Sequence, residues 1–175
     1  FAPGMRVVIL HQHFKTPQSG GAIRSYYLAR ALADRGIATV VITAHNGPKK
    51  TEDVEGIEVH YLPVAYDNRF GFWKRLVSFW QFLRLGTREA KAVHDVDYYY
   101  AISTPLTVGL IARWLKRATG VPYFFEVGDL WPEAPIQLGY IRNVWLKKWL
   151  YRLERSIYRE AQAVVALSVD IETYI

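Results

Sequence analysis

Short apolar runs alternate with amphipathic segments along the chain. The apolar runs are rich in Val, Ile, Tyr and Phe, which is typical of buried strands, and we expect strands at residues 6–11, 39–43, 56–62, 97–102, 121–127 and 163–167. Between them, helical spacing of apolar positions predicts helices at residues 22–35, 71–94, from 105 onward and 144–161. The third of these helices is expected to start at Pro105 and to be capped by Ser103 or Thr104. Residues 46–55 are polar and are expected to form a loop.

Strands that are regularly separated by helices indicate a parallel sheet, because parallel strands need crossover connections. We therefore predict an α/β fold, a Rossmann-like doubly wound parallel sheet of about six to seven strands with strand order 3-2-1-4-5-6. The binding site of such a sheet lies beyond the carboxyl ends of its strands. Residues 1–4 have the character of a cloning remnant, and residues 5–175 are expected to form one domain.

The loop after the first predicted strand ends in two glycines, Gly20 and Gly21, which open the first helix. Backbone N–H groups at such a helix start can bind a diphosphate, helped by the helix dipole, and Arg24 follows one turn inside. A tight turn made by two glycines explains the same spacing equally well. The loop lacks the Gly-x-Gly-x-x-Gly pattern of dinucleotide sites. His11 and His13 fit a polar loop role better than a metal site.

Three carboxylates, those of Glu126, Asp129 and Glu133, lie within eight residues at the end of the fifth predicted strand. This is the edge at which a Rossmann site belongs, and Trp131 offers a flat apolar face that suits a sugar ring. The alternative is structural, with Asp129 capping the next helix and Glu133 on its surface.

The helix predicted at residues 71–94 has more apolar positions than one face of a sheet can cover. Its first turns mix aromatic and basic side chains, which is the pattern of an interfacial helix lying among lipid headgroups, and residues 145–155 repeat it. A core helix with snorkelling cations is the alternative. The side chains expected to face a membrane are Phe72, Trp73, Lys74, Arg75, Trp80 and Arg84.

Composition narrows the functional class. The 175 residues contain no cysteine, which excludes a disulfide framework and a thiolate metal site. The formal net charge of +6 favours anionic partners such as phosphates or lipid headgroups. Nucleic acid is not an expected partner, because the chain carries no reading helix, RNA-binding sheet motif or basic tail. Charges interrupt every apolar stretch before the roughly 18 to 20 residues that a membrane-spanning helix needs.

Several of these motifs resemble the N-terminal domain of family-four glycosyltransferases, in particular the bacterial branch that builds capsule, exopolysaccharide and O-antigen units. The similarity covers residues 6–175 and is most specific in the Asp-Leu-Trp-Pro-Glu stretch at 129–133. It includes the double-glycine segment 20–24 and the turn at 103–106. One departure is Gly128, which stands where this branch usually has arginine, so the resemblance assigns no side-chain role there.

The resemblance implies two Rossmann domains of the GT-B type that face each other across a cleft. This chain would be the acceptor-side half, expected to be inactive alone, and the donor-binding C-terminal domain would be absent from it. The enzyme would transfer a hexosyl or N-acetylhexosaminyl group with retention, and the departing diphosphate would take the acceptor proton. No cofactor and no essential metal are expected. The expected partners are a nucleotide-sugar, in particular a UDP-sugar, a lipid-linked saccharide acceptor, an anionic membrane surface and the chain's own C-terminal domain, in the cytoplasm at the inner face of the plasma membrane.

The resemblance and the motifs together assign the expected site residues to three roles. Those expected at the catalytic centre are Asp129, Glu126 and Glu133. Those expected to bind the donor diphosphate are Gly20, Gly21 and Arg24. Those expected to line the acceptor or sugar pocket are Trp131, His11, His13, Ser103 and Thr104. Two alternatives remain open, namely a GT-B transferase with a soluble acceptor and a non-catalytic membrane-binding partner subunit.

Overall fold

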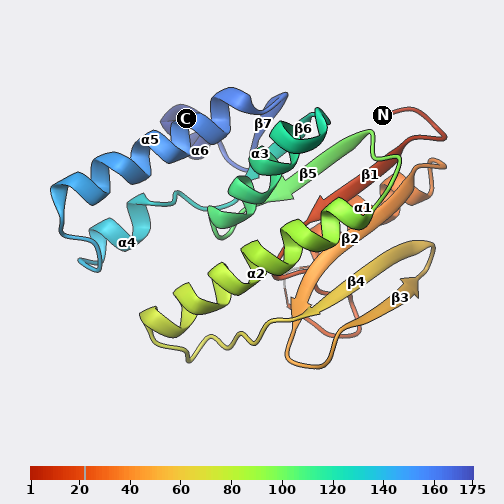
Figure 1. The fold of residues 1–175 in the computed structure, drawn as a ribbon, viewed down its shortest axis with the longest axis horizontal. Coiled ribbons are helices and arrows are strands. Elements are labelled where there is room, and N and C mark those ends of the chain that lie inside the picture. Colours follow the sequence, from red (N-terminus) through yellow and green to blue (C-terminus); the bar gives the residue numbers. More distant parts are fainter. Residues whose placement is uncertain (22) are drawn as a thin grey trace.

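The computed structural model describes residues 1–21 and 23–175, and its centre is one seven-stranded sheet (Figure 1). The strands are β1 Arg6–Leu10, β2 Ala38–His45, β3 Lys50–Val54, β4 Ile57–Pro63, β5 Tyr98–Ile102, β6 Tyr123–Val127 and β7 Ala163–Ala166. Their order across the sheet is β3-β4-β2-β1-β5-β6-β7. All neighbouring strands are parallel except β3 and β4. The six predicted strands therefore lie in the predicted order, and the α/β fold class is confirmed.

Helices connect the parallel strands and cover both faces of the sheet. They are α1 Arg24–Ala33, α2 Phe72–Ala92, α3 Thr107–Thr119, α4 Glu133–Gln137, α5 Val144–Glu160 and α6 Val169–Tyr174. The four longer helices, α1, α2, α3 and α5, fall in the segments where helical spacing predicts them, although the expected first residue of α1, Ala22, lies outside the described residues. Within the described part of the chain, no helix is both long and apolar enough to cross a membrane.

The polar segment at residues 46–55 is not a loop throughout, so that prediction was wrong. Its second half is β3, which pairs antiparallel with β4 at the edge of the sheet. The side chains of β3 are exposed except that of Val54, which is half-buried. The strand therefore has no alternation of apolar and polar residues from which it could be predicted. Lys50 and Glu52 pair at 2.7 Å on its surface, and charged side chains of this kind protect an edge strand from pairing with other chains.

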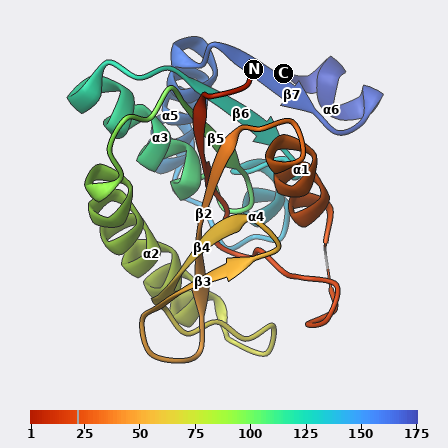
Figure 2. The ribbon, with the colours of Figure 1, turned by 90° about the vertical axis from the view of Figure 1, so that its right-hand side faces the viewer.

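The central strand β1 supplies side chains to two separate cores, one on each face of the sheet. Val7 and Ile9 pack with residues of α1, whereas Val8 and Leu10 pack with residues of α2 and α3. Figure 2 shows this layering, with α1 on one side of the sheet and α2 and α3 on the other. Because β1 is covered on both faces, all four side chains are fully buried and the strand reads as a continuous apolar run.

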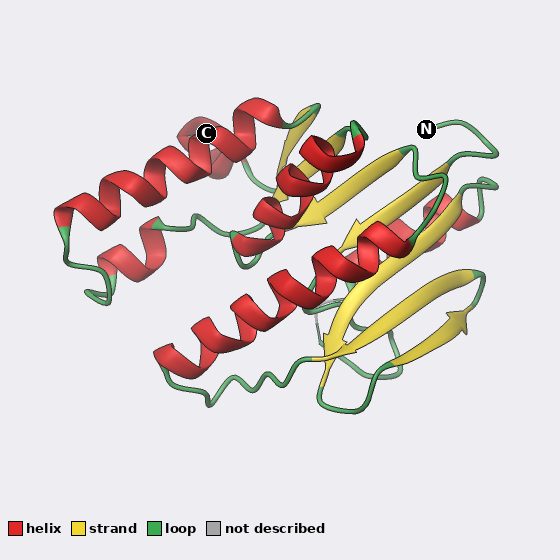
Figure 3. Cartoon of the chain, viewed as in Figure 1, coloured by secondary structure: helices red, strands yellow, loops and turns green. Residues whose placement is uncertain are grey.

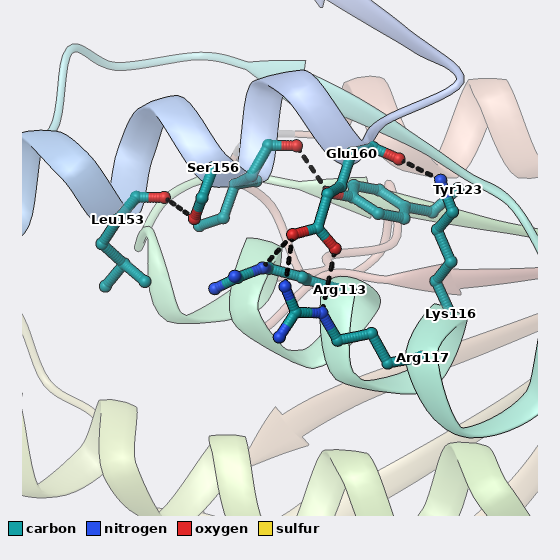
Figure 4. A network of polar contacts seen from close by, with 8 residues as sticks. Arg113, Lys116, Arg117, Tyr123, Leu153, Ser156 and Glu160 are labelled. Carbon is teal, nitrogen blue, oxygen red and sulfur yellow. Dashed lines mark hydrogen bonds and ion pairs between the residues drawn. The ribbon is translucent and has the colours of Figure 1, made fainter.

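A network of charged side chains fixes the C-terminal end of α5 to α3 (Figure 4). The Glu160 carboxylate accepts from Arg113 Nε at 2.8 Å and from Arg117 Nη2 at 2.6 Å, and the Glu160 carbonyl accepts from Lys116 Nζ at 2.5 Å. The contact with Arg117 contributes most to a pKa of Glu160 below its usual value. The network anchors α5 at one end, so that the other end can project from the sheet.

The packing of α3 against α5 and β6 predicts a large effect of one added methyl group. A Cβ at Gly109 would lie 2.8 Å from Ile157 Cγ2 and 3.0 Å from Phe125 Cε2. We expect Gly109→Ala to lower the free energy of unfolding by about 1–3 kcal/mol, the usual range for overpacking. Denaturant unfolding followed by circular dichroism measures this change. The matched control is Gly71→Ala, where nothing lies within 4 Å of the added Cβ, and equal stability of the two variants would contradict the packing argument.

Candidate functional site

The carboxyl ends of β1, β5 and β6 lie side by side and lead into the segments 11–13, 103–104 and 128–131. The N-terminal ends of α2 and α5, with α4, extend beyond the strand ends at the same edge (Figure 3). Two cavities open here, and we call them the polar pocket and the apolar cavity. They share the lining residues His13, Thr104, Gly128 and Asp129, so they meet at the ends of β5 and β6.

The polar pocket has a volume of about 250 Å³ and lies over the ends of β1, β5, β6 and β7. Seven of the expected site residues contribute to its wall, from four different chain segments. They are His11, His13, Arg24, Ser103, Thr104, Glu126 and Asp129. Among the described residues, no group of three or more His, Cys, Asp or Glu side chains is arranged to hold a metal ion.

Glu126 is fully buried at the base of this pocket, near the end of β6. Its carboxylate forms an ion pair with Arg24, the first residue of α1, and its Oε2 accepts from the Tyr100 hydroxyl at 2.9 Å. Oε2 thus has a hydrogen-bond donor, and Oε1 faces the Arg24 guanidinium as its charge partner. Glu126 therefore holds Arg24 in place, and the half-exposed Arg24 side chain presents N–H donors to a ligand in the pocket.

Ser103 and Thr104 do not cap α3 as the sequence suggested. The N-cap position is Leu106, and no side chain caps the helix. Instead, the Ser103 hydroxyl accepts from the Gly128 backbone N–H at 3.0 Å, and the Thr104 hydroxyl donates to the Asp129 carboxylate. These two bonds tie the segment after β5 to the segment after β6 and orient Asp129.

The absence of a side chain at Gly128 has a local steric reason. A Cβ there would lie 3.2 Å from the Ser103 carbonyl oxygen, which is closer than side chains normally approach backbone. The two segments can therefore draw together through the bond between Gly128 and Ser103 without strain. A side chain at this position, such as the arginine that the resemblance leads us to expect, would require the Ser103 segment to shift slightly.

The apolar cavity is larger, with a volume of about 760 Å³, and lies between the first turns of α2, the segment after β6 and α4. Aromatic pairs line two of its sides. The rings of Phe72 and Tyr140 stack with centroids 4.8 Å apart, and those of Tyr66 and Phe79 stack at 6.2 Å. Trp131, expected to line the acceptor or sugar pocket, also lines this cavity.

Two histidines follow β1, and both are held in the neutral state at neutral pH. Burial, helped by His13 and Arg24, lowers the pKa of His11 to about 3, and its Nδ1 lies 2.9 Å from the Ser25 hydroxyl. Burial, helped by Lys15, lowers the pKa of His13 to about 4. The ring of His13 packs against that of Tyr66 with centroids 4.4 Å apart. A neutral imidazole at this position can hydrogen-bond a substrate hydroxyl without adding charge.

Glu133 lies in the wall of the apolar cavity, but its carboxylate is occupied. One oxygen accepts from the Tyr151 hydroxyl and the other from Gln137 Nε2 at 3.0 Å. The bond from Tyr151 contributes most to a pKa of Glu133 below its usual value. Through these contacts Glu133 fixes α4 to α5, and it shapes the cavity wall. Asp129 does not cap α4, whose N-cap is Pro132 without a side-chain bond.

The other expected site residues divide into two groups. Gly20 and Gly21 are exposed, have positive φ angles of 68° and 93°, and precede α1 closely. Within the described part of the chain, neither glycine lines the polar pocket or the apolar cavity. Of the six side chains expected to face a membrane, those exposed to solvent are Trp73, Lys74, Trp80 and Arg84. Phe72 and Arg75 are half-buried and line the apolar cavity instead.

Sequence reasoning missed the aromatic side chains that give the apolar cavity its walls. Tyr66 follows β4, and since β4 is parallel to β2, residues directly after it lie at the same edge as the site. The place of Tyr66 after a parallel strand could therefore have predicted it as a site residue. Phe79 belongs to a helix face that the sequence predicted to be apolar, without assigning that face to the site. Tyr140 lies between two helices, and no periodic pattern marks it.

Comparisons with known proteins agree with the fold. A family model described as "Glycosyl transferase 4-like domain" matches residues 19–175. Among solved structures, the chain is similar to sucrose-phosphate synthase from Thermosynechococcus elongatus, with a TM-score of 0.68 and 15% sequence identity. The alignment covers 97% of this chain and 44% of that enzyme, so the chain spans less than half of the solved structure's length. At this identity the likeness shows the fold, a Rossmann-like half of a GT-B structure. A search of curated protein sequences gave no match.

The buried neutral histidines predict a loss of stability on acidification. The pKa of His11 falls from its usual value of 6.5 to about 3 on folding, so below pH 6.5 the unfolded chain binds a proton that the folded chain does not. The free energy of unfolding should fall as the pH drops from about 6.5 toward 4, by up to about 1.4 kcal/mol per pH unit for this ring. Urea unfolding across this range measures the slope. We expect His11→Gln to make the slope shallower and His94→Gln, at an exposed position, to leave it unchanged. Equal slopes for both variants would argue against a neutral, buried His11.

Proposed function

Because the chain belongs to the glycosyl transferase 4-like domain family, we propose that it is the acceptor-binding half of a retaining glycosyltransferase. The sugar comes from a nucleotide-sugar, with UDP the proposed nucleotide, and the acceptor is a lipid-linked saccharide in bacterial cell-surface polysaccharide synthesis. A second, donor-binding domain completes the site. The observation that carries this proposal is an apolar cavity at the carboxyl edge of the sheet that meets the polar pocket at Asp129.

The polar pocket suits the donor's diphosphate and transferred sugar. Arg24 brings a half-exposed guanidinium to its wall. Among the described residues Gly20 and Gly21 do not line the pocket, and their proposed contact with the diphosphate rests on their place just before α1, which Arg24 begins. Guanidinium and backbone N–H groups are the donors that bind phosphate oxygens best. In the proposed reaction the departing diphosphate takes the proton of the acceptor hydroxyl, so catalysis rests on positioning and on charge stabilisation at that diphosphate, without a covalent nucleophile or a metal.

Asp129 is the carboxylate that we propose to position the acceptor hydroxyl. It lies where the two cavities meet, and Thr104 engages one of its oxygens. Within the described residues its second oxygen has no protein partner. The Glu133 carboxylate accepts two hydrogen bonds from protein donors, and the buried Glu126 carboxylate is paired with Arg24 and bonded by Tyr100, so we propose that both support the site rather than contact the reacting atoms.

A membrane surface is the proposed location of the acceptor. The two tryptophans nearest the projecting ends of α2 and α5 are highly exposed, Trp73 at 77% and Trp145 at 80%. Lys74 and Lys148 lie beside them and are also exposed. Exposed tryptophan next to lysine is the composition of interfacial helices. We propose that the protein binds peripherally to the cytoplasmic face of the plasma membrane, with these two ends in the headgroup region.

Replacing Asp129 tests the catalytic assignment. In the complete enzyme, we expect Asp129→Asn to lower kcat about 100-fold, because a misplaced acceptor hydroxyl loses the benefit of orientation. Transfer of radiolabelled sugar to a lipid-linked acceptor measures the rate. The matched control is Asp34→Asn. Like Asp129, Asp34 is an exposed carboxylate with one side-chain partner, which is Arg30. This variant should keep wild-type activity. A folded Asp129→Asn enzyme with near wild-type kcat would remove Asp129 from the site.

Removing the exposed tryptophans tests the membrane assignment. We expect the double variant Trp73→Ala and Trp145→Ala to bind vesicles of phosphatidylglycerol about tenfold or more weakly, because it loses apolar area that enters the headgroup region. Co-sedimentation at low salt measures binding. The control is Trp114→Ala, which removes an exposed tryptophan from α3 and should bind like wild type. Transfer without any vesicle binding by the wild-type enzyme would favour a soluble acceptor instead.

A further inference from the structure

Arg75 lies in the first turn of α2 and forms part of the wall of the apolar cavity. Its side chain is held rigidly by the segment that precedes the helix. Nε donates to the Phe70 carbonyl at 2.9 Å, and Nη2 donates to the Asn68 carbonyl at 2.6 Å. A long, flexible side chain is thus fixed in one orientation before any ligand arrives.

The positive charge of Arg75 is not neutralised by the protein. Both of its partners are neutral carbonyls, and among the described residues no carboxylate lies within ion-pair distance of it. Other arginines of the chain do have such partners, for example Arg69 with Asp67 and Arg113 with Glu160. A guanidinium has five N–H donors, and the two carbonyls use only two of them, so donors remain for an anion.

Neither carboxylate of the same cavity wall, Glu133 or Asp129, lies within ion-pair distance of Arg75. Glu133 accepts from Tyr151 and Gln137, and Asp129 accepts from Thr104. The cavity therefore holds a fixed, half-buried cation among mostly apolar side chains. Because such surroundings screen charge weakly, an anion placed there would be attracted more strongly than at an exposed arginine.

Helix geometry sets the order of groups along the cavity. Phe72, Arg75 and Phe79 are spaced three and four residues apart, so they share one face of α2. Phe79 stacks on Tyr66, which leads back to the His13 side of the cavity, and Phe72 stacks on Tyr140 at the projecting end. At 1.5 Å per residue, Arg75 lies about 6 Å along the axis from Phe79 and about 4.5 Å from Phe72. Along the cavity, the polar end near His13 comes first, the Arg75 cation follows, and the aromatic pair of Phe72 and Tyr140 lies at the projecting end.

This order matches an acceptor with three consecutive parts. We propose that Arg75 binds the diphosphate of a prenyl-diphosphate-linked saccharide, with the saccharide toward Asp129 and the prenyl chain leaving over Phe72 and Tyr140. The assignment rests on the proposed function and gives it a residue that recognises the linkage between sugar and lipid. Arg75 thus acts inside the cavity, whereas Arg84 on the same helix is exposed to solvent and lies outside the apolar cavity.

Binding of soluble analogues to the complete enzyme tests this assignment without any need for catalysis. The probes are farnesyl diphosphate, kept below the concentration at which it forms micelles, farnesol and inorganic diphosphate, each titrated by calorimetry without vesicles. We expect farnesyl diphosphate to bind at least tenfold more tightly than either of the other two, and to bind more weakly as salt is added. We expect Arg75→Gln to weaken the binding of farnesyl diphosphate at least tenfold and to leave the affinity for farnesol unchanged.

The control Arg84→Gln removes the same charge from an exposed position of α2, and it should change both affinities less than twofold. Arg75→Lys keeps the charge but not the planar fork, so its affinity should lie between those of wild type and Arg75→Gln, and it serves if the glutamine variant fails to fold. Equal weakening by Arg75→Gln and Arg84→Gln would overturn the proposal, because it would indicate general attraction only. Inorganic diphosphate binding as tightly as farnesyl diphosphate, with the same dependence on Arg75, would also overturn it, since the site would then recognise a free anion.

The test of the Arg75 diphosphate site can fail or succeed independently of the test of the proposed glycosyltransferase function. Asp129→Asn should abolish most transfer and leave farnesyl diphosphate binding intact. Binding that depends on Arg75 in an enzyme that transfers no sugar would refute the proposed function and leave the diphosphate site standing. Sugar transfer to a lipid acceptor with no dependence of binding on Arg75 would refute the site and leave the function standing.

Discussion

The buried carboxylate of Glu126 is the constraint on which the geometry of this site depends. A carboxylate with no exposed surface costs several kcal/mol unless charged or hydrogen-bonding partners surround it. Here Arg24 comes from the start of α1 and Tyr100 from β5, so one side chain of β6 draws three elements together. The segments after β5 and β6 are close because these strands pair in register, with Ile102 opposite Glu126, and the Ser103 backbone N–H donates to the Glu126 carbonyl. The bonds from Gly128 to Ser103 and from Thr104 to Asp129 then place Asp129 beside the buried Glu126.

The sheet was predictable because strands that are buried on both faces consist of continuous runs of apolar residues. β1, β2 and β6 are apolar runs, and helices with an apolar face separate the parallel strands, so the order of six strands follows from the chain alone. The strand that escaped prediction, β3, obeys a different requirement. It lies at an edge with its side chains in solvent, so it needs no apolar alternation, and charged side chains such as Lys50 and Glu52 protect it from pairing with other chains.

The site was predictable only as far as it depends on strand ends. The residues directly after β1, β5 and β6 had to meet at one edge, and they do. Their partners could not be predicted, because a hydroxyl such as that of Thr104 can cap a helix or bind a carboxylate with similar energy, and the choice depends on a segment 25 residues away. The same limit applies to Arg75. Its spacing on α2 marks a basic aromatic face, but only the position of Tyr140 decides that this part of the face encloses a cavity.

The two cavities also differ in a way that bears on the chemistry they can host. The polar pocket has the Arg24–Glu126 ion pair in its wall, whereas the apolar cavity is bounded mostly by aromatic and other apolar side chains, with the Arg75 cation among them. The two meet at a junction at Asp129. The neutral His13 adds a hydrogen-bonding group there without a charge that would attract water. A transferase has to keep water from the activated sugar while it admits an acceptor hydroxyl. An acceptor whose apolar part fills the larger cavity would itself exclude water, and its hydroxyl would then be the nucleophile nearest to the junction.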